Sequence, residues 1–292
     1  MTEVLHYDAF TTTPGTGNPA GVVLDAEGLS DVEMQRIAAR VGFSETAFVL
    51  PSTPADLRLR YFTPGYEVDL CGHATMASFA ALVEAGRIGP GRYLTQTGAG
   101  ILPMDVALDG DRPAVTMRQA APRFEPYDGA VADVASVLGL DAVDIDTALP
   151  IVYGSTGLWS LVVPIRGLEP FGRMHPHNAR FPEILRQIPT AAVHAFCRET
   201  IDPSAEMHAR HFAPPATGLV EDPVTGTASG VLGAYWAWYI APGASEYRLR
   251  CEQGTEMGRA GSVGVHVLVG DPAQVSITGT AVRAAILNIE PT

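Results

Sequence analysis

The sequence contains no lysine, because all 19 of its basic residues are arginines. A Schiff-base lysine is therefore impossible, which excludes pyridoxal-phosphate enzymes and lysine aldolases. The Walker-type phosphate loop is excluded for the same reason. The 32 acidic residues give a formal net charge of −13. This charge argues against a nucleic-acid partner, because phosphate binding requires clustered cations.

Cysteines and long apolar runs are also scarce. The three cysteines, Cys71, Cys197 and Cys251, lie far apart in the chain, and this odd, sparse set indicates reduced thiols. The N-terminal segment lacks the charged-then-apolar pattern of a signal peptide. No apolar run approaches the roughly 20 residues that a membrane-spanning helix needs. We therefore expect a cytoplasmic protein with no membrane partner.

The residues that are present describe a globular chain of mixed structure. Hydrophobic residues make up 47 % and charged residues 17 % of 292 residues, which is typical of a soluble enzyme-like protein with room for two domains. Short extended patterns predict strands at 4–10, 45–51, 56–64, 159–165, 192–199, 207–214, 263–270, 273–279 and 284–289. Helical patterns predict helices at 31–41, 72–86, 133–140, 181–188 and 225–240. For the first helix, Ser30 and Glu33 form a predicted capping box and Gly42 is the predicted stop. The helices at 72–86 and 225–240 are apolar nearly all round, so both should be buried on most sides.

One segment occurs twice. "RYFTPGYEVDLCGHATMA" (60–77) returns as "RHFAPPATGLVEDPVTGTASGV" (210–231), with a loop four residues longer in the second copy. The repeat indicates a duplication into two pseudo-symmetric lobes of an α/β (α+β) protein. In each lobe strands would surround one central helix. We expect an N-terminal lobe of residues 1–120, to which a tail of about 280–292 can return, and a C-terminal lobe of residues 121–280.

The repeated turns suggest how an acidic protein binds an acidic substrate. Each turn leads into a helix N-terminus, where backbone N–H groups lack intrahelical partners and carry partial positive charge. Two such termini facing one cleft between the lobes would bind a carboxylate or stabilise an enolate-like oxygen. We therefore expect a small anionic substrate.

Three ionisable residues near these turns are candidates for catalysis. Glu45 in "SETAF" is either a surface residue or a base in an apolar pocket, and His73 in "CGHAT" is either structural or a proton relay. Asp222 in "VEDPVTG" is either a helix cap or part of the site. A metal is not expected, because "HPH" (175–177) and "HARH" (208–211) lack a carboxylate or cysteine set. "GTGNPAG" (15–21) has the wrong spacing for a dinucleotide loop.

Five segments carry a resemblance to a known family. "DAFTTTPGTGNPAGVV", "SETAFV", "FTPGYEVDLCGHAT", "EDPVTGTASG" and "EQGTEMGR" occur in the order found in PhzF-like proteins, a family named for a phenazine-biosynthesis isomerase. The resemblance covers essentially the whole chain. It implies the diaminopimelate-epimerase fold, a site between two lobes, a homodimer and no cofactor or metal.

The resemblance also assigns roles to individual residues. It implies catalytic roles for Glu45, His73 and Asp222, and substrate binding by Asn18, Gly72, Gly226 and Thr227. The thiol pair of the related epimerases falls on Cys71 and Thr225, so the two-thiol reaction is lost. The sequence departs from the family pattern at Gly15 and Ala260, in loops expected to shape the pocket.

The function expected from the resemblance is that of a cofactor-independent isomerase. It would move a proton or double bond in a small cyclic or conjugated carboxylate by general acid/base catalysis. The pathway would be specialised-metabolite biosynthesis, such as that of an antibiotic. Two alternatives are a cysteine-assisted epimerase or racemase that uses Cys71, and a non-catalytic small-molecule binding protein on the same fold.

Overall fold

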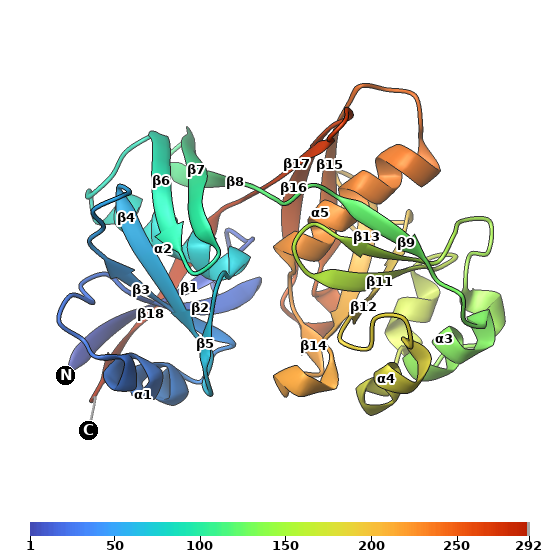
Figure 1. The fold of residues 1–292 in the computed structure, drawn as a ribbon, viewed down its shortest axis with the longest axis horizontal. Coiled ribbons are helices and arrows are strands. Elements are labelled where there is room, and N and C mark those ends of the chain that lie inside the picture. Colours follow the sequence, from blue (N-terminus) through green and yellow to red (C-terminus); the bar gives the residue numbers. More distant parts are fainter. Residues whose placement is uncertain (291–292) are drawn as a thin grey trace. The chain divides into compact units, whose positions relative to one another are not determined.

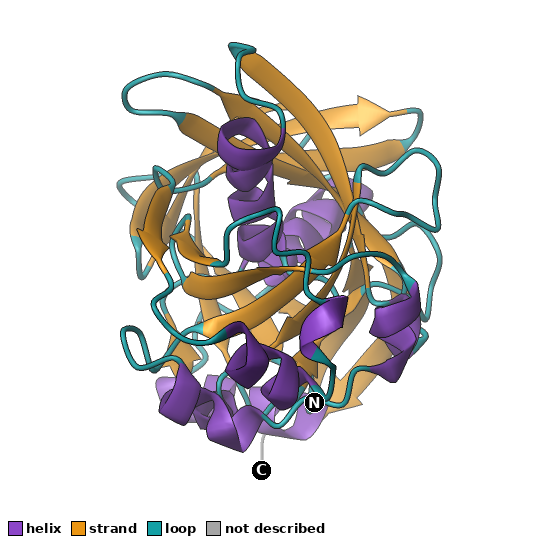
Figure 2. Cartoon of the chain, turned by 90° about the vertical axis from the view of Figure 1, so that its right-hand side faces the viewer, coloured by secondary structure: helices purple, strands orange, loops and turns teal. Residues whose placement is uncertain are grey.

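The computed structural model describes residues 1–290 and divides the chain into two compact units (Figure 1). Unit 1 comprises residues 1–118 together with the chain from Thr278 onward, and unit 2 comprises residues 119–277. Strands dominate the secondary structure (Figure 2). No helix within residues 1–290 is long and apolar enough to cross a membrane.

Unit 1 is built from a sheet that surrounds one apolar helix, α2. The sheet runs in pairing order β18, β1, β2, β3, β4, β6, β7 and β8, with β2–β3 and β4–β6 parallel and the other pairs antiparallel. Helix α2 packs against β1, β2, β3, β8 and β18. The elements are β1 (Thr2–Ala9), β2 (Asn18–Val23), α1 (Asp31–Val41), β3 (Glu45–Leu50), β4 (Leu57–Phe62), β5 (Glu67–Val68), α2 (Gly72–Glu84), β6 (Gly91–Thr97), β7 (Gly100–Asp109), β8 (Arg112–Arg118) and β18 (Ala281–Ile289).

Unit 2 repeats this plan around a second apolar helix, α5. Its sheet runs in the order β9, β10, β11, β12, β13, β15 and β16, with β11–β12 and β13–β15 parallel. Helix α5 packs against β10, β15 and β16. The elements are β9 (Arg123–Pro126), α3 (Val131–Leu138), β10 (Val152–Ser155), β11 (Trp159–Pro164), α4 (Phe181–Ile184), β12 (Ala192–Cys197), β13 (Met207–Phe212), β14 (Glu221–Asp222), α5 (Gly226–Tyr235), β15 (Glu246–Gln253) and β16 (Gly261–Leu268). Strand β17 (Gln274–Gly279) crosses the boundary at Thr278, and short 3₁₀ turns fill several connections.

The two units share one order of elements and pairings. In unit 1, β4 pairs antiparallel with β5, the chain enters α2, and β6 returns parallel to β4. In unit 2, β13 pairs antiparallel with β14, the chain enters α5, and β15 returns parallel to β13. The predicted fold class, two internally similar α/β lobes with strands around a central helix, is confirmed.

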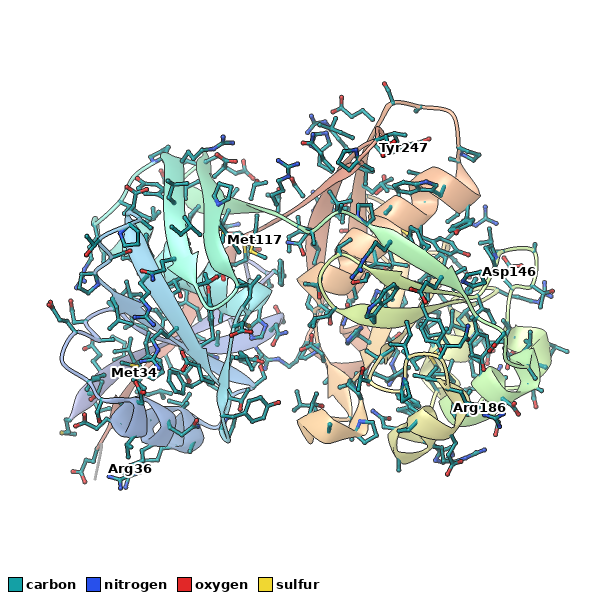
Figure 3. The ribbon with its side chains drawn as sticks, viewed as in Figure 1. Met34, Arg36, Met117, Asp146, Arg186 and Tyr247 are labelled. Atoms are coloured by element: carbon teal, nitrogen blue, oxygen red, sulfur yellow. The ribbon has the colours of Figure 1, made fainter. Side chains whose placement is uncertain are left out.

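Local sequence signals explain how α1 begins and ends. Ser30 Oγ accepts the N–H of Glu33, and the Glu33 carboxylate accepts the N–H of Ser30, as the predicted capping box requires. Gly42 ends the helix with φ +73°, a left-handed conformation that glycine adopts at little cost. The apolar face of the helix, which includes Met34, is buried, whereas Arg36 is exposed (Figure 3).

Two helix predictions are wrong in extent. The helix predicted at 181–188 ends at Ile184, because Leu185 leaves the helical region with ψ +48°. The helix predicted at 225–240 is α-helical only from Gly226 to Tyr235 and continues as a π-helix from Trp236 to Ile240. The sequence analysis also missed β6, β7, β9, β10 and β15 and the two-residue strands β5 and β14.

Candidate active site

Glu45 is placed by the turn between α1 and β3. It is the first residue of β3 and lies opposite Ala20 of the parallel strand β2. Its neighbour Thr46 is fully buried, whereas the Glu45 side chain is 20 % exposed. The carboxylate therefore lies at the end of a buried strand and still reaches solvent.

His73 is placed by the start of α2. The helix begins at Gly72, and its N-cap residue, Cys71, makes no side-chain capping hydrogen bond. Thr75 Oγ1 donates to the Cys71 carbonyl over 2.6 Å and lies 2.7 Å from the Tyr61 hydroxyl, which fixes the first turn to β4. The His73 side chain is 10 % exposed and is held at a helix N-terminus.

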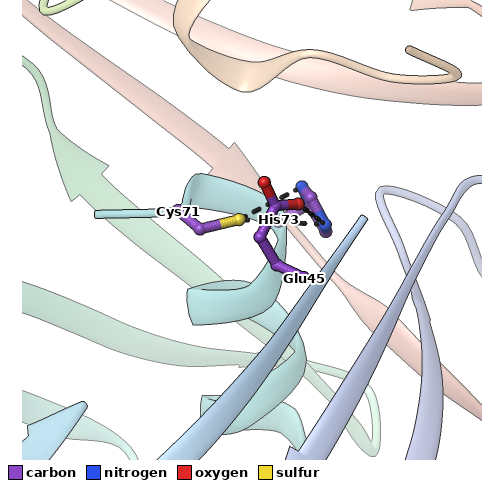
Figure 4. A group of neighbouring side chains, drawn as sticks. All are labelled: Glu45, Cys71 and His73. Carbon is purple, nitrogen blue, oxygen red and sulfur yellow. Dashed lines mark hydrogen bonds and ion pairs between the residues drawn. The ribbon is translucent and has the colours of Figure 1, made fainter. Parts of the chain in front are cut away.

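The side chains of Glu45, Cys71 and His73 converge at this point (Figure 4). Glu45 Oε2 lies 3.3 Å from His73 Nε2, and Cys71 Sγ lies 3.4 Å from His73 Nδ1. Ser44 Oγ lies 3.3 Å from His73 Nε2. The sequence analysis missed Ser44, although it directly precedes Glu45 in "SETAF". A carboxylate and a thiol that both contact one imidazole form a site suited to proton transfer.

Asn18 and Gly72 belong to the same unit. Asn18 is the first residue of β2, lies opposite Ala9 of β1 and is fully buried. The loop before it is held by the buried Asp8, whose Oδ2 accepts the N–H of Gly15 over 2.7 Å. Gly72 is the first residue of α2.

The predicted residues of unit 2 gather at the start of α5. Gly226 and Thr227 are its first two residues, and the N-cap residue is Thr225. Asp222 is therefore not the N-cap residue of α5, which was one of its two interpretations from the sequence. Instead it accepts a hydrogen bond of 2.5 Å from Thr225 Oγ1.

Gln253, which the sequence analysis missed, fixes this turn. Its Nε2 donates to the Asp222 carbonyl over 2.7 Å, and its Oε1 accepts the Thr225 N–H over 3.2 Å. Gln253 is 1 % exposed. It belongs to "EQGTEMGR", one of the five segments of the resemblance, so that motif supports the turn carrying Asp222.

The same motif holds a buried histidine. His208 Nδ1 lies 2.8 Å from Glu252 Oε1, and Nε2 lies 2.9 Å from Glu256 Oε1. Burial alone would lower the pKa of His208, but the two carboxylates outweigh it and raise the pKa to about 9. This histidine is therefore positively charged at neutral pH and ties β13 to the segment after β15.

The repeated Arg-x-Phe pattern has a structural cause. Arg60 forms a two-pronged ion pair with Glu67 and stacks 5.1 Å from the centre of the Phe62 ring. Arg210 forms the equivalent pair with Glu221 and stacks 5.0 Å from the centre of the Phe212 ring. In both units the arginine fixes the strand that leads toward the helix start.

These observations define an α/β protein of two internally similar units with an acid/base cluster at a helix start. The phenazine biosynthesis-like (PhzC-PhzF) family profile matches residues 7–285, and the chain belongs to this family. The chain is 49 % identical over 282 residues to the uncharacterized isomerase YfhB of Bacillus subtilis, covering 96 % of both. It is 31 % identical over 255 residues to the trans-2,3-dihydro-3-hydroxyanthranilate isomerase of Pseudomonas aeruginosa, covering 86 % of this chain and 85 % of that one.

Solved structures agree with this assignment. A PhzF-family protein of Bacillus anthracis superposes with a TM-score of 0.97 at 47 % identity, over 99 % of both chains. A hydroxyproline epimerase from Agrobacterium vitis superposes with a TM-score of 0.63 at 14 % identity, over 98 % of this chain and 91 % of that one, and shows a shared fold only. The chain is an isomerase of the PhzF type, as the resemblance implied.

Proposed function

We propose that this chain is a cofactor-independent isomerase that moves a proton, and with it a double bond, in a small cyclic or conjugated carboxylate. The observation that carries the proposal is the 3.3 Å contact between Glu45 Oε2 and His73 Nε2 at the partly exposed start of α2. A carboxylate base in contact with an imidazole can take a proton from carbon and return it elsewhere on the same molecule. Nothing in this step requires a metal or a redox cofactor.

In this proposal each residue has a defined task. Glu45 removes the proton, and His73 orients the Glu45 carboxylate and relays the proton. The N–H groups at the start of α2, beginning with Gly72, stabilise the negative charge that develops as the proton leaves. We assign Asn18 to substrate binding because it begins the strand next to β3, which carries Glu45.

We further propose that the start of α5 binds substrate. Gly226 and Thr227 would bind the carboxylate through backbone N–H groups and a hydroxyl, and Asp222 would orient the substrate. The turn that carries Asp222 is fixed by Gln253, as a preorganised site requires.

The name of one relative supports the proposed substrate class. The Pseudomonas aeruginosa relative is named for trans-2,3-dihydro-3-hydroxyanthranilate, and we propose a related carboxylate here. A role in specialised-metabolite biosynthesis, such as antibiotic production, is part of the proposal. So are a cytoplasmic location and a homodimer, which size-exclusion chromatography with light scattering would test.

Cysteine-assisted epimerisation is a second candidate, favoured by one contact. Cys71 Sγ lies 3.4 Å from His73 Nδ1, so the imidazole can take the thiol proton. The equivalent residue in unit 2 is Thr225, whose hydroxyl donates to Asp222. A thiol reaction predicts inactivation by alkylation of Cys71, whereas catalysis by Glu45 predicts that a Cys71→Ala variant remains active.

The deciding experiment follows proton exchange in D2O with a panel of cyclic dienyl carboxylates. The wild-type protein, dialysed against chelator, should incorporate deuterium and shift the double bond. Glu45→Gln keeps the size of the side chain but cannot accept a proton, so turnover should fall at least ~10²-fold with substrate binding largely kept. Glu27→Gln, at an exposed position of the same unit, is the matched control and should retain full turnover. Near-normal turnover by Glu45→Gln, or activity restored only by an added metal or flavin, would end the proposal.

A further inference from the structure

The Glu45, Cys71 and His73 side chains also match the geometry of a zinc site. Their ligand atoms lie within 4.8 Å of one another. Within residues 1–290, no other group of three or more histidine, cysteine and acidic side chains lies close enough together to hold a metal ion. His73 Nε2 is 3.3 Å from Glu45 Oε2 and 3.8 Å from Cys71 Sγ. Tetrahedral zinc with ordinary bond lengths places a nitrogen about 3.3 Å from a carboxylate oxygen and about 3.6 Å from a sulfur.

We propose that Glu45, Cys71 and His73 form an inhibitory binding site for Zn²⁺. A thiolate, an imidazole and a carboxylate together favour zinc over the hard cations magnesium and calcium. The partial exposure of Glu45 and His73 gives the ion a route from solvent and leaves room for a water as the fourth ligand. The inhibitory part of this inference rests on the proposed role of Glu45 as the base, whereas the binding part does not.

The proton balance of binding is simple. Cys71 binds as a thiolate, so its thiol proton is released to solvent when the ion enters. His73 binds through Nε2 and keeps its proton on Nδ1, which lies 3.4 Å from the Cys71 sulfur and can donate to it. Glu45 binds through a carboxylate oxygen. An oxygen bound to zinc no longer accepts a proton from carbon, so the metal and the proposed reaction compete for the same atom.

Cobalt(II) alone is the probe for the site, because it replaces zinc and reports its ligands by absorption. Wild-type protein should bind one equivalent of Co²⁺ with a near-ultraviolet sulfur-to-cobalt band and the intense visible bands of tetrahedral coordination. Zn²⁺ should displace it. Cys71→Ser should abolish the sulfur band, and Glu45→Gln should weaken binding at least about tenfold, as loss of a ligand predicts. Circular dichroism of each variant shows whether it is folded.

The matched control is His175→Gln/His177→Gln. These two exposed histidines lie in "HPH", the obvious place for adventitious metal on the surface. The control should bind Co²⁺ with unchanged affinity and spectrum. A wild-type protein without the sulfur band, or binding lost in the control and retained in Cys71→Ser, would overturn the proposal.

The inhibition is tested separately, with the deuterium-exchange assay and added Zn²⁺. Turnover should fall in parallel with occupancy of the site and return when chelator is added. Absence of Co²⁺ binding would refute the metal site and leave the catalytic role of Glu45 standing. Full turnover with zinc bound through Glu45 would refute both the inhibition and that catalytic role.

Discussion

Raising the pH from 6.5 to 8.5 should destabilise unit 2, because its fold holds His208 in the charged form. The pKa of this histidine is about 9 in the fold, against an ordinary value of 6.5. A folded pKa above the unfolded one means that the charge-dependent stabilisation is fully present below pH 6.5 and is lost as the pH rises through 9. Each pH unit inside this interval should lower the free energy of unfolding by about 1.4 kcal/mol. The expected loss between pH 6.5 and 8.5 is therefore about 2–3 kcal/mol.

The chain itself provides a probe for this measurement. Its tryptophans, Trp159, Trp236 and Trp238, all lie within residues 119–277, so tryptophan fluorescence during urea unfolding reports on unit 2. The window ends at pH 8.5 because burial raises the pKa of Cys197 to about 12. At higher pH the unfolded chain would lose a thiol proton that the folded chain keeps, which would destabilise the fold for a different reason.

Two variants separate His208 from other groups. His208→Gln should be less stable than the wild type at pH 6.5 and should not lose stability as the pH rises across the window. His266→Gln alters a partly exposed histidine that pairs with Glu246 in the same unit, and it should keep the wild-type slope. The reasoning is refuted if wild-type unit 2 has the same free energy of unfolding at both pH values, or if His208→Gln retains the slope.

Three further predictions concern stability. Arg210 and Glu221 form an ion pair in which both side chains are 10 % exposed. Arg210→Gln leaves the Glu221 carboxylate unpaired and should lower the free energy of unfolding by about 3–5 kcal/mol. The equivalent Arg60→Gln removes a pairing with more exposed partners and should cost less than about 1 kcal/mol, and equal losses in calorimetric unfolding would contradict this difference. Gln253→Ala should lower the free energy of unfolding by about 1–3 kcal/mol, because it removes the hydrogen bonds that hold the turn before α5. Turnover per folded molecule should fall as well, and unchanged kinetics would argue against that role. Burial lowers the pKa of His211 to about 4, so unit 2 should also lose stability as the pH falls from 6.5 toward 4, which the same fluorescence titration would detect.

Local physics explains the parts of the fold that the sequence predicted. The capping box at Ser30 and the left-handed Gly42 depend only on neighbouring residues. The two central helices were recognisable because a helix that is apolar on every side must be buried. In contrast β15 has polar residues at exposed positions over its first half, and its pairing with β13 and β16 involves distant segments. No local pattern contains that information.

In the candidate site, too, the sequence predicted some features, and others depend on contacts between distant segments. Glu45, His73 and Asp222 were selected through the resemblance, because each residue type alone had an ordinary structural explanation. The contact between Glu45 and His73 depends on how β3 and α2 pack together, which no spacing in the sequence expresses. Gln253 was missed because it acts on a turn 28 residues earlier in the chain. Its position in "EQGTEMGR" was a signal, but the physical role required coordinates.

The pairing of β1 with β18 has a consequence for the order in which the protein is made. Strand β1 pairs with β2 and with β18, and Thr2 lies opposite Ile289. One of its two neighbours is therefore synthesised only when the ribosome has reached β18. Residues 119–277 form a continuous stretch and are complete earlier. The usual N-terminal-first order of domain formation is thus reversed for the last step, because unit 2 emerges whole while β1 still has an open edge. A nascent chain stalled before Ala281 would therefore carry a finished second unit and a first unit that still lacks β18.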